Sequence, residues 1–204
     1  MKVLEERLDR IRSELVELHH LSKKAVELSI AAMYGGEDEE LEVRRIEKQA
    51  DVMNTDIEND SLSAVALFQP VAKDLRFLST VMRLSGNYER ITDLALKIAH
   101  STVDNDFCRD KLEEMHATVL EMFDIVENAL KGEVEGMKGE LVSRDDRIDL
   151  LEREVLDQVE GRVLDRNMLG IIFAATHLER IGDILSKNGA RIIFIEEGRR
   201  VWIK

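Results

Sequence analysis

Apolar residues recur at intervals of three and four along almost the whole chain, and no stretch sustains the period-two alternation that marks a half-buried strand. The few interruptions are Gly35-Gly36, Gln69-Pro70, a polar stretch over 102–106, a stretch bounded by glycines over 132–139, and Gly161. Helices are therefore expected over residues 2–34, 38–66, 71–101, 106–131, 140–160 and 164–197. Long helices with short connections are typical of bundles, so the sequence predicts an all-α fold.

The composition agrees with a helical protein and makes its surface acidic. Aromatic residues make up only 4% of the chain and there is one proline, which favours helices over β-sandwiches and barrels. The 29 Lys and Arg residues against 42 Asp and Glu residues leave a net charge of −13. Such a surface repels nucleic-acid phosphate and attracts cations, so no direct nucleic-acid partner is expected.

The features that depend on the cellular compartment favour the cytoplasm. The single cysteine, Cys108, cannot form an intramolecular disulfide and suits a reducing environment. Residues 1–15 alternate charged and apolar side chains, unlike a signal peptide or an anchor. The longest apolar run, 168–175, is too short to cross a bilayer. We therefore expect a cytoplasmic protein that reaches membranes only through its partners.

An internal repeat divides the chain into two halves. The segment Tyr88–Leu94 (YERITDL) aligns with Leu178–Ile184 (LERIGDI) at an offset of 90 residues, and Arg76 aligns with Arg166 at the same offset. Each segment lies in a long predicted helix that follows two others. The sequence therefore predicts two tandem homologous three-helix bundles. Their expected boundaries are residues 1–103 and residues 104–204.

Acidic side chains spaced four residues apart occur at repeat-related positions. Residues four apart share one face of a helix, where two carboxylates repel each other unless a cation lies between them. Helical projection brings one pair from the second helix and one from the third helix of each bundle to a shared outer groove. Carboxylate oxygens suit divalent or trivalent ions such as iron, manganese, magnesium or zinc, so we expect a multinuclear surface site on each bundle. The candidate metal ligands are Glu47, Asp51, Glu89 and Asp93 in the first bundle and Asp145, Asp149, Glu179 and Asp183 in the second.

Two other interpretations remain open. If the acids form only a solvated flank, the chain is a metal-independent helical adaptor. Two Glu-x-x-His pairs, Glu17/His20 and Glu113/His116, instead suggest a di-iron carboxylate oxidase or an iron-storage bundle. Those proteins direct such pairs inward, whereas Glu17 and His20 project away from the apolar stripe of their helix. P-loop, dinucleotide-binding and HExxH motifs are absent from the sequence, so we do not expect an enzyme.

Three segments together resemble the PhoU family of phosphate-uptake regulators. They are QPVAKDLR over 69–76, YERITD over 88–93 and HLERIGD over 177–183. The resemblance spans essentially the whole chain and implies two three-helix repeats. It further implies negative regulation of phosphate uptake and of phosphate-starvation signalling, through contact with subunits of the phosphate ABC transporter and with a sensor histidine kinase. A homodimer is expected, and the family's metal-binding acid-x-x-x-Asp motifs fall on the eight candidate carboxylates.

Some positions depart from the family pattern or carry a structural expectation of their own. The family usually has asparagine four residues after the last acid of each motif, where this chain has Lys97 and Lys187. We expect these lysines to place positive charge one turn beyond Asp93 and Asp183. In the first repeat, Pro70 is expected to preset the first turn of the third helix.

Overall fold

The computed structural model describes residues 2–203, and these form six α-helices and no strand. The helices are α1 (Lys2–Met33), α2 (Glu37–Phe68), α3 (Ala72–Ala99), α4 (Arg109–Leu130), α5 (Met137–Val159) and α6 (Arg166–Glu197). Every helix end lies within three residues of its expected position, and the predicted all-α fold is confirmed. No helix within residues 2–203 combines the length and the apolar character that crossing a bilayer requires.

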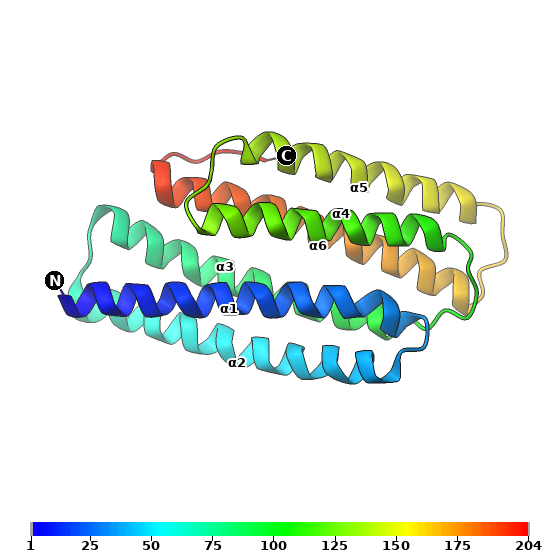
Figure 1. Ribbon diagram of the computed structural model, residues 1–204, viewed down its shortest axis with the longest axis horizontal. Helices are drawn as coiled ribbons and strands as arrows, with labels where there is room; N and C mark the ends of the chain where they lie inside the picture. The colour runs from blue at the N-terminus through cyan, green and yellow to red at the C-terminus, as the bar shows by residue number, and fades with distance from the viewer. Residues whose placement is uncertain (1, 204) are drawn as a thin grey trace.

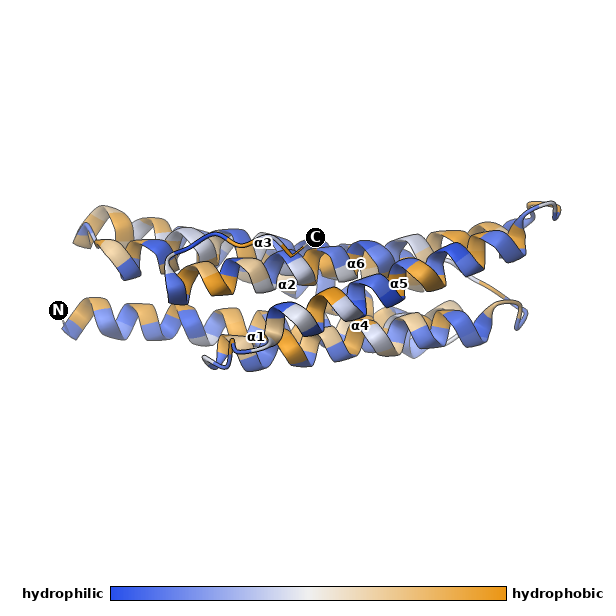
Figure 2. Cartoon of the chain, turned by 90° about the horizontal axis from the view of Figure 1, so that it is seen from above, coloured by the Kyte–Doolittle hydropathy of each residue, from blue (hydrophilic) through white to orange (hydrophobic). Residues whose placement is uncertain are grey.

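The helices form two bundles that lie side by side (Figure 1). Helices α1, α2 and α3 pack against one another, and α4, α5 and α6 do the same. Contacts of α3 with α6 and of α1 with α4 join the two bundles. Figure 2 shows α1 and α4 on one side of the molecule and α3 and α6 on the other. The expected boundary between residues 103 and 104 falls in the connection from α3 to α4, and its exact place stays a prediction.

Each helix buries one apolar stripe, and hydrophobic and hydrophilic residues alternate along the helices in Figure 2. In the repeated segments, Ile91 of α3 and Ile181 of α6 are fully buried. Burial of a side chain of this size contributes about 1.5–3 kcal/mol. Because these isoleucines fix the rotation of α3 and α6, Glu89 and Glu179 come to lie at the edge of the core, where both are half-buried.

A small polar cluster is buried where the two bundles meet. The Nδ1 atom of His19 on α1 and the hydroxyl of Tyr88 on α3 are hydrogen-bonded at 3.0 Å. The ring of His19 also packs edge-on against Phe123 of α4, with the ring centroids 5.3 Å apart. In the neighbouring turn of α3, Asn87 donates from Nδ2 to Oδ1 of Asn188 on α6 at 2.5 Å. These contacts hold the first bundle against the second.

We expect His19 to contribute stability that is lost as the pH falls below 6.5. Burial, followed by the charge of His20, lowers the pKa of this fully buried side chain from 6.5 to about 3. The folded state therefore favours the neutral form, so the contribution of His19 to stability, complete above pH 6.5, falls by about 1 kcal/mol per pH unit below it. Urea unfolding between about pH 7 and 5 measures this loss. His19→Gln keeps polar atoms and does not titrate, so the stability of wild type relative to this variant should fall as the pH is lowered; an equal pH dependence in both proteins would contradict this origin.

The turn between α2 and α3 differs from the expectation for Pro70. Helix α3 begins at Ala72, with Val71 as its N-cap, so Pro70 lies in the connection and not in the first turn of the helix. Gln69 and Ala72 adopt left-handed backbone conformations with φ of 46° and 48°. The expectation was wrong because the chain reverses through these two residues, which places the start of α3 beyond the proline.

Candidate metal centres

The first groove lies between α2 and α3 and gathers four carboxylates. Helix α2 contributes Glu47 and Asp51, and α3 contributes Glu89 and Asp93. The pKa of Glu89 is raised, first by burial and then by the charges of Asp93, Asp51 and Glu47. A carboxylate that responds to three others lies within their electrostatic reach. The fold therefore brings the other three residues that the sequence assigned to the first site within electrostatic reach of Glu89.

The second groove repeats this arrangement between α5 and α6. Helix α5 contributes Asp145 and Asp149, and α6 contributes Glu179 and Asp183. Burial is the largest cause that raises the pKa of Glu179 to about 7, and the next causes are the negative charges of Asp183, Glu152, Asp149 and Asp145. Burial, together with the neighbouring negative charges, thus favours a proton on Glu179 up to about neutral pH.

The lysines at the family's asparagine positions neutralise one aspartate in each groove. Lys97 Nζ lies 2.7 Å from Oδ2 of Asp93, and Lys187 Nζ lies 2.9 Å from Oδ2 of Asp183. All four side chains are substantially exposed, so each pair contributes only about 0–1 kcal/mol to stability. These ion pairs are weak enough to be exchanged for a more highly charged cation.

The two grooves differ at the first acid of the α2 and α5 pairs. Asp145 is buried, with 4% of its surface exposed, and its Oδ1 accepts a hydrogen bond from Ser186 Oγ at 3.3 Å. Its counterpart Glu47 is half-buried. The repeat predicts equivalent roles for Glu47 and Asp145. However, the shorter side chain of Asp145 is held inside the groove by Ser186. This serine has no polar counterpart in α3, where Leu96 occupies the repeat-related position.

Two further oxygen-bearing residues lie one turn along the grooves and were missed in the sequence. Asn54 of α2 and Glu152 of α5 follow Asp51 and Asp149 by three residues and are related by the same offset of 98. Asn54 Oδ1 is buried, makes no hydrogen bond within residues 2–203, and lies 3.9 Å from the position of a Cβ added to Gly86 of α3. Glu152 adds its charge to the second groove. The sequence could have revealed both residues, because the correspondence between the two repeats continues one helical turn beyond the acid pairs.

The donors in each groove suit a hard cation, although their side chains do not converge on one point in these rotamers. Within residues 2–203, no three His, Cys, Asp or Glu side chains lie close enough together to ligate a common ion. Carboxylates from two helices and an additional oxygen nevertheless match the chemistry that divalent and trivalent ions prefer. Partly exposed carboxylates change rotamer at small cost. The donor chemistry therefore fits a metal, and the role of the eight residues as ligands stays a prediction.

The two Glu-x-x-His pairs are engaged in separate contacts. Glu113 Oε1 accepts from Arg109 Nε at 2.9 Å, and His116 Nε2 donates to the backbone carbonyl of Val26 at 2.9 Å. In the other pair, His20 Nε2 lies 3.3 Å from Glu127 Oε1. These side chains do not meet at an inward-facing site of the kind found in di-iron bundles.

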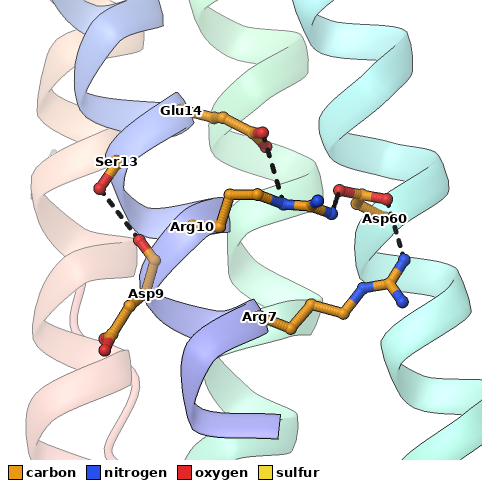
Figure 3. A network of polar contacts seen from close by, with 6 residues as sticks. All are labelled: Arg7, Asp9, Arg10, Ser13, Glu14 and Asp60. Carbon is orange, nitrogen blue, oxygen red and sulfur yellow. Dashed lines mark hydrogen bonds and ion pairs between the residues drawn. The ribbon is translucent and has the colours of Figure 1, made fainter. Parts of the chain in front are cut away.

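Asp60, an acid outside the two grooves, is paired with arginines. Asp60 of α2 pairs with Arg7 of α1 at 2.9 Å and also with Arg10 of α1 (Figure 3). Arg10 in turn lies 3.7 Å from Glu14, measured from Nε to Oε1. Here two arginines neutralise one aspartate, whereas each groove places several carboxylates against one another. This contrast favours the grooves over the α1–α2 surface as candidate cation sites.

Comparisons with known proteins establish the family. A PhoU domain matches residues 15–102 and again residues 112–192, once in each bundle. The chain belongs to the PhoU family. A PhoU homologue from Archaeoglobus fulgidus, named a phosphate-specific transport system accessory protein, is 41% identical over 207 residues, with all of both chains covered. A homologue of the same name from Methanothermobacter thermautotrophicus is 30% identical, with 98% of this chain and 91% of the relative covered.

Solved PhoU structures share the fold. The crystal structure of PhoU from Pseudomonas aeruginosa superposes with a TM-score of 0.83 at 23% identity and covers 96% of this chain and 99% of that one. The phosphate transport system regulatory protein PhoU from Streptococcus pneumoniae gives a TM-score of 0.84 at 18% identity, with 98% and 99% covered. At these identities the likeness concerns the arrangement of the six helices alone.

Proposed function

We propose that this PhoU-family protein is a metal-binding negative regulator of phosphate uptake and of phosphate-starvation signalling. The observation that carries the metal-binding part is the clustering of four carboxylates in each of two repeat-related grooves. The phosphate part is supported by relatives that are named accessory proteins of phosphate transport.

The protein would act by contact and not by catalysis. Its proposed partners are subunits of the phosphate ABC transporter and a sensor histidine kinase, which it would meet in the cytoplasm as a homodimer. The relatives' names support an accessory role beside a transport system. Direct contact with nucleic acid is not part of the proposal, because the net charge of −13 opposes it.

The grooves offer a physical route from metal binding to a change in the protein. A bound ion would supply positive charge between α2 and α3, or between α5 and α6. The carboxylates from the two helices would then turn toward each other, and Lys97 and Lys187 would be released from Asp93 and Asp183. Binding to the folded state alone stabilises it by mass action, and the released lysines change the charge that the surface presents to a partner.

Metal analysis of the purified protein tests this proposal. Wild-type protein prepared without chelator is expected to hold about 1–4 ions per bundle, and Asp93→Ala or Asp183→Ala should each lose the ions of one groove, because each removes a carboxylate that binding needs. Metal content per chain is measured by inductively coupled plasma mass spectrometry after dialysis.

Asp110→Ala is the matched control, because Asp110 is an exposed acid of α4 outside both grooves. This variant should keep the wild-type metal content. A wild-type protein without metal, with unchanged partner binding in both groove variants, would instead establish the metal-independent adaptor. Iron that depends on Glu113 or His116 would contradict the groove assignment.

A further inference from the structure

Cations repeat every seven residues along one side of α3. Arg76, Arg83, Arg90 and Lys97 form this row, and all are exposed except Arg76, which is half-buried. Seven residues make almost two full helical turns, so the row drifts only slowly around the helix. Successive cations are about 10.5 Å apart along the axis, and the row is about 31 Å long.

Helix α6 repeats the row with one substitution. Arg166, Phe173, Arg180 and Lys187 occupy the positions offset by 90 residues from the α3 row, and Arg191 adds another cation. Phe173 is 51% exposed. Helices α3 and α6 lie side by side on the same side of the molecule and run in opposite directions, and we call the surface along the line where they meet the α3/α6 seam (Figures 1 and 2).

Like charges face each other across the α3/α6 seam. Arg191 of α6 lies within reach of Arg83 of α3, since the pKa of Arg191 is lowered by burial and then by the charge of Arg83. Farther along the seam, the charges of Arg180 on α6 and Lys97 on α3 both act on His177. The hydrogen bond between Asn87 and Asn188 lies between these points and fixes the register of the two rows.

In the part of the chain that the structure describes, the arginines of the seam make no direct contact with an anion, although the charge of Arg90 acts on Glu89. Within residues 2–203, six of them make no hydrogen bond or ion pair: Arg76, Arg83, Arg90, Arg166, Arg180 and Arg191. The two lysines of the rows are neutralised, Lys97 by Asp93 and Lys187 by Asp183. A strip of unpaired arginine on a chain of net charge −13 is electrostatically complementary to an anion.

We propose that the α3/α6 seam docks an acidic α-helix of a partner protein whose carboxylates repeat every seven residues. A helix lying along the seam would present such carboxylates at the same interval of about 10.5 Å as the arginines. One carboxylate would enter between Arg83 and Arg191 and relieve their repulsion. Phe173 would meet an apolar side chain at the remaining position of the α6 row.

Other anionic partners match the seam less well. An extended peptide presents side chains to one side every second residue, at about 6.7 Å, which does not match the spacing of the rows. A flat anionic membrane would also face the acidic grooves beside α3 and α6, which would repel it. The inference rests on the partner-contact part of the proposed function and is independent of metal binding.

Binding of a synthetic helix to the full chain tests the inference. The probe is a labelled Ala- and Gln-based peptide of about 22 residues with Glu at every seventh position, long enough to span the row. Fluorescence anisotropy at low ionic strength measures Kd. Arg83→Glu and Arg83→Gln should weaken binding by at least about tenfold and about threefold, because they remove attraction at the point where Arg83 and Arg191 face each other.

The matched control is Arg153→Glu, since Arg153 is an exposed arginine of α5 that makes no ion pair within residues 2–203. It should change Kd by no more than about twofold. A second control is a permuted peptide whose Glu residues are moved out of the seven-residue register. Raising the salt should change the Kd of this permuted peptide by no more than about twofold. That permuted peptide should bind wild type at least about tenfold more weakly than the regular one. Equal binding of the two peptides, or equal effects of Arg83→Glu and Arg153→Glu, would overturn the inference. Arg83-dependent binding of anionic vesicles or of polyphosphate, with neither peptide bound, would also overturn it.

Discussion

Replacement of Tyr88 by alanine is expected to lower the free energy of unfolding by about 4 kcal/mol or more. Tyr88 is fully buried, and its ring packs edge-on against His19 with the centroids 5.3 Å apart. The variant loses this packing, opens a cavity between α1 and α3, and leaves the imidazole of His19 without its hydrogen-bond partner. Urea unfolding followed by circular dichroism at pH values near 8 measures the change while His19 stays neutral.

Tyr88→Phe separates the hydroxyl from the ring. It keeps the ring but removes the hydrogen bonds of the hydroxyl with His19 and Asn188, and should cost about 1–2 kcal/mol. Similar losses for Phe and Ala would show that the hydrogen bonds, and not the packing, account for the effect of Tyr88. A loss below about 1.5 kcal/mol for Ala would mean that the region between the bundles contributes little to stability.

Glu179→Gln is expected to stabilise metal-stripped protein and to reduce its stabilisation by metal. The pKa of Glu179 is raised from 4.5 to about 7, so the folded state holds a proton that the unfolded state releases across this range. The contribution of Glu179 to the stability of the stripped protein therefore falls as the pH rises from 4.5 to 7, and the full penalty persists above pH 7. Because Glu179 is only half-buried and water screens its charge, we expect a gain of about 1–2 kcal/mol at pH values near 8 on removal of the charge.

With added metal, wild type should become more stable than Glu179→Gln. Wild type gains stability from an ion held by the four charges of the second groove, whereas the variant has lost one of them. Thermal unfolding with chelator, and then with added Mn²⁺, measures the stability of the two proteins under each condition. Glu58→Gln, at an exposed position of α2 outside the grooves, should leave both values unchanged. A variant that is less stable than wild type under chelator would contradict the repulsion inferred for Glu179.

The sequence was sufficient to predict the helices because their ends coincide with strong local signals. Asp165 caps α6 by accepting from the backbone N–H of Met168, and Gly198 ends the helix in a left-handed conformation. The least accurate boundaries were the starts of α4 and α5, at Arg109 and Met137. Both follow left-handed caps without a side-chain hydrogen bond, at Cys108 and at a glycine, so no capping residue marks these starts in the sequence.

The candidate site was predictable as far as helical spacing reaches. Spacing of four within a helix and the offset between repeats identified the acids that gather in each groove, and spacing also predicted Lys97 beside Asp93. Burial could not be predicted in this way. The enclosure of Asp145 depends on Ser186, which comes from another helix, and the buried oxygen of Asn54 faces a glycine of α3. Such features arise from the packing of two helices, so the spacing of residues within either helix does not predict them.

Arg83 in the first repeat is replaced by Phe173 in the second, so the two ends of the α3/α6 seam are not equivalent. Two identical halves related by a twofold axis would receive a rod-shaped guest equally well from either end. Here one half offers a guanidinium where the other offers an aromatic ring, so the two approaches are no longer equivalent. Divergence after duplication has thus converted a symmetric platform into a polar one, on which orientation as well as identity can be selected.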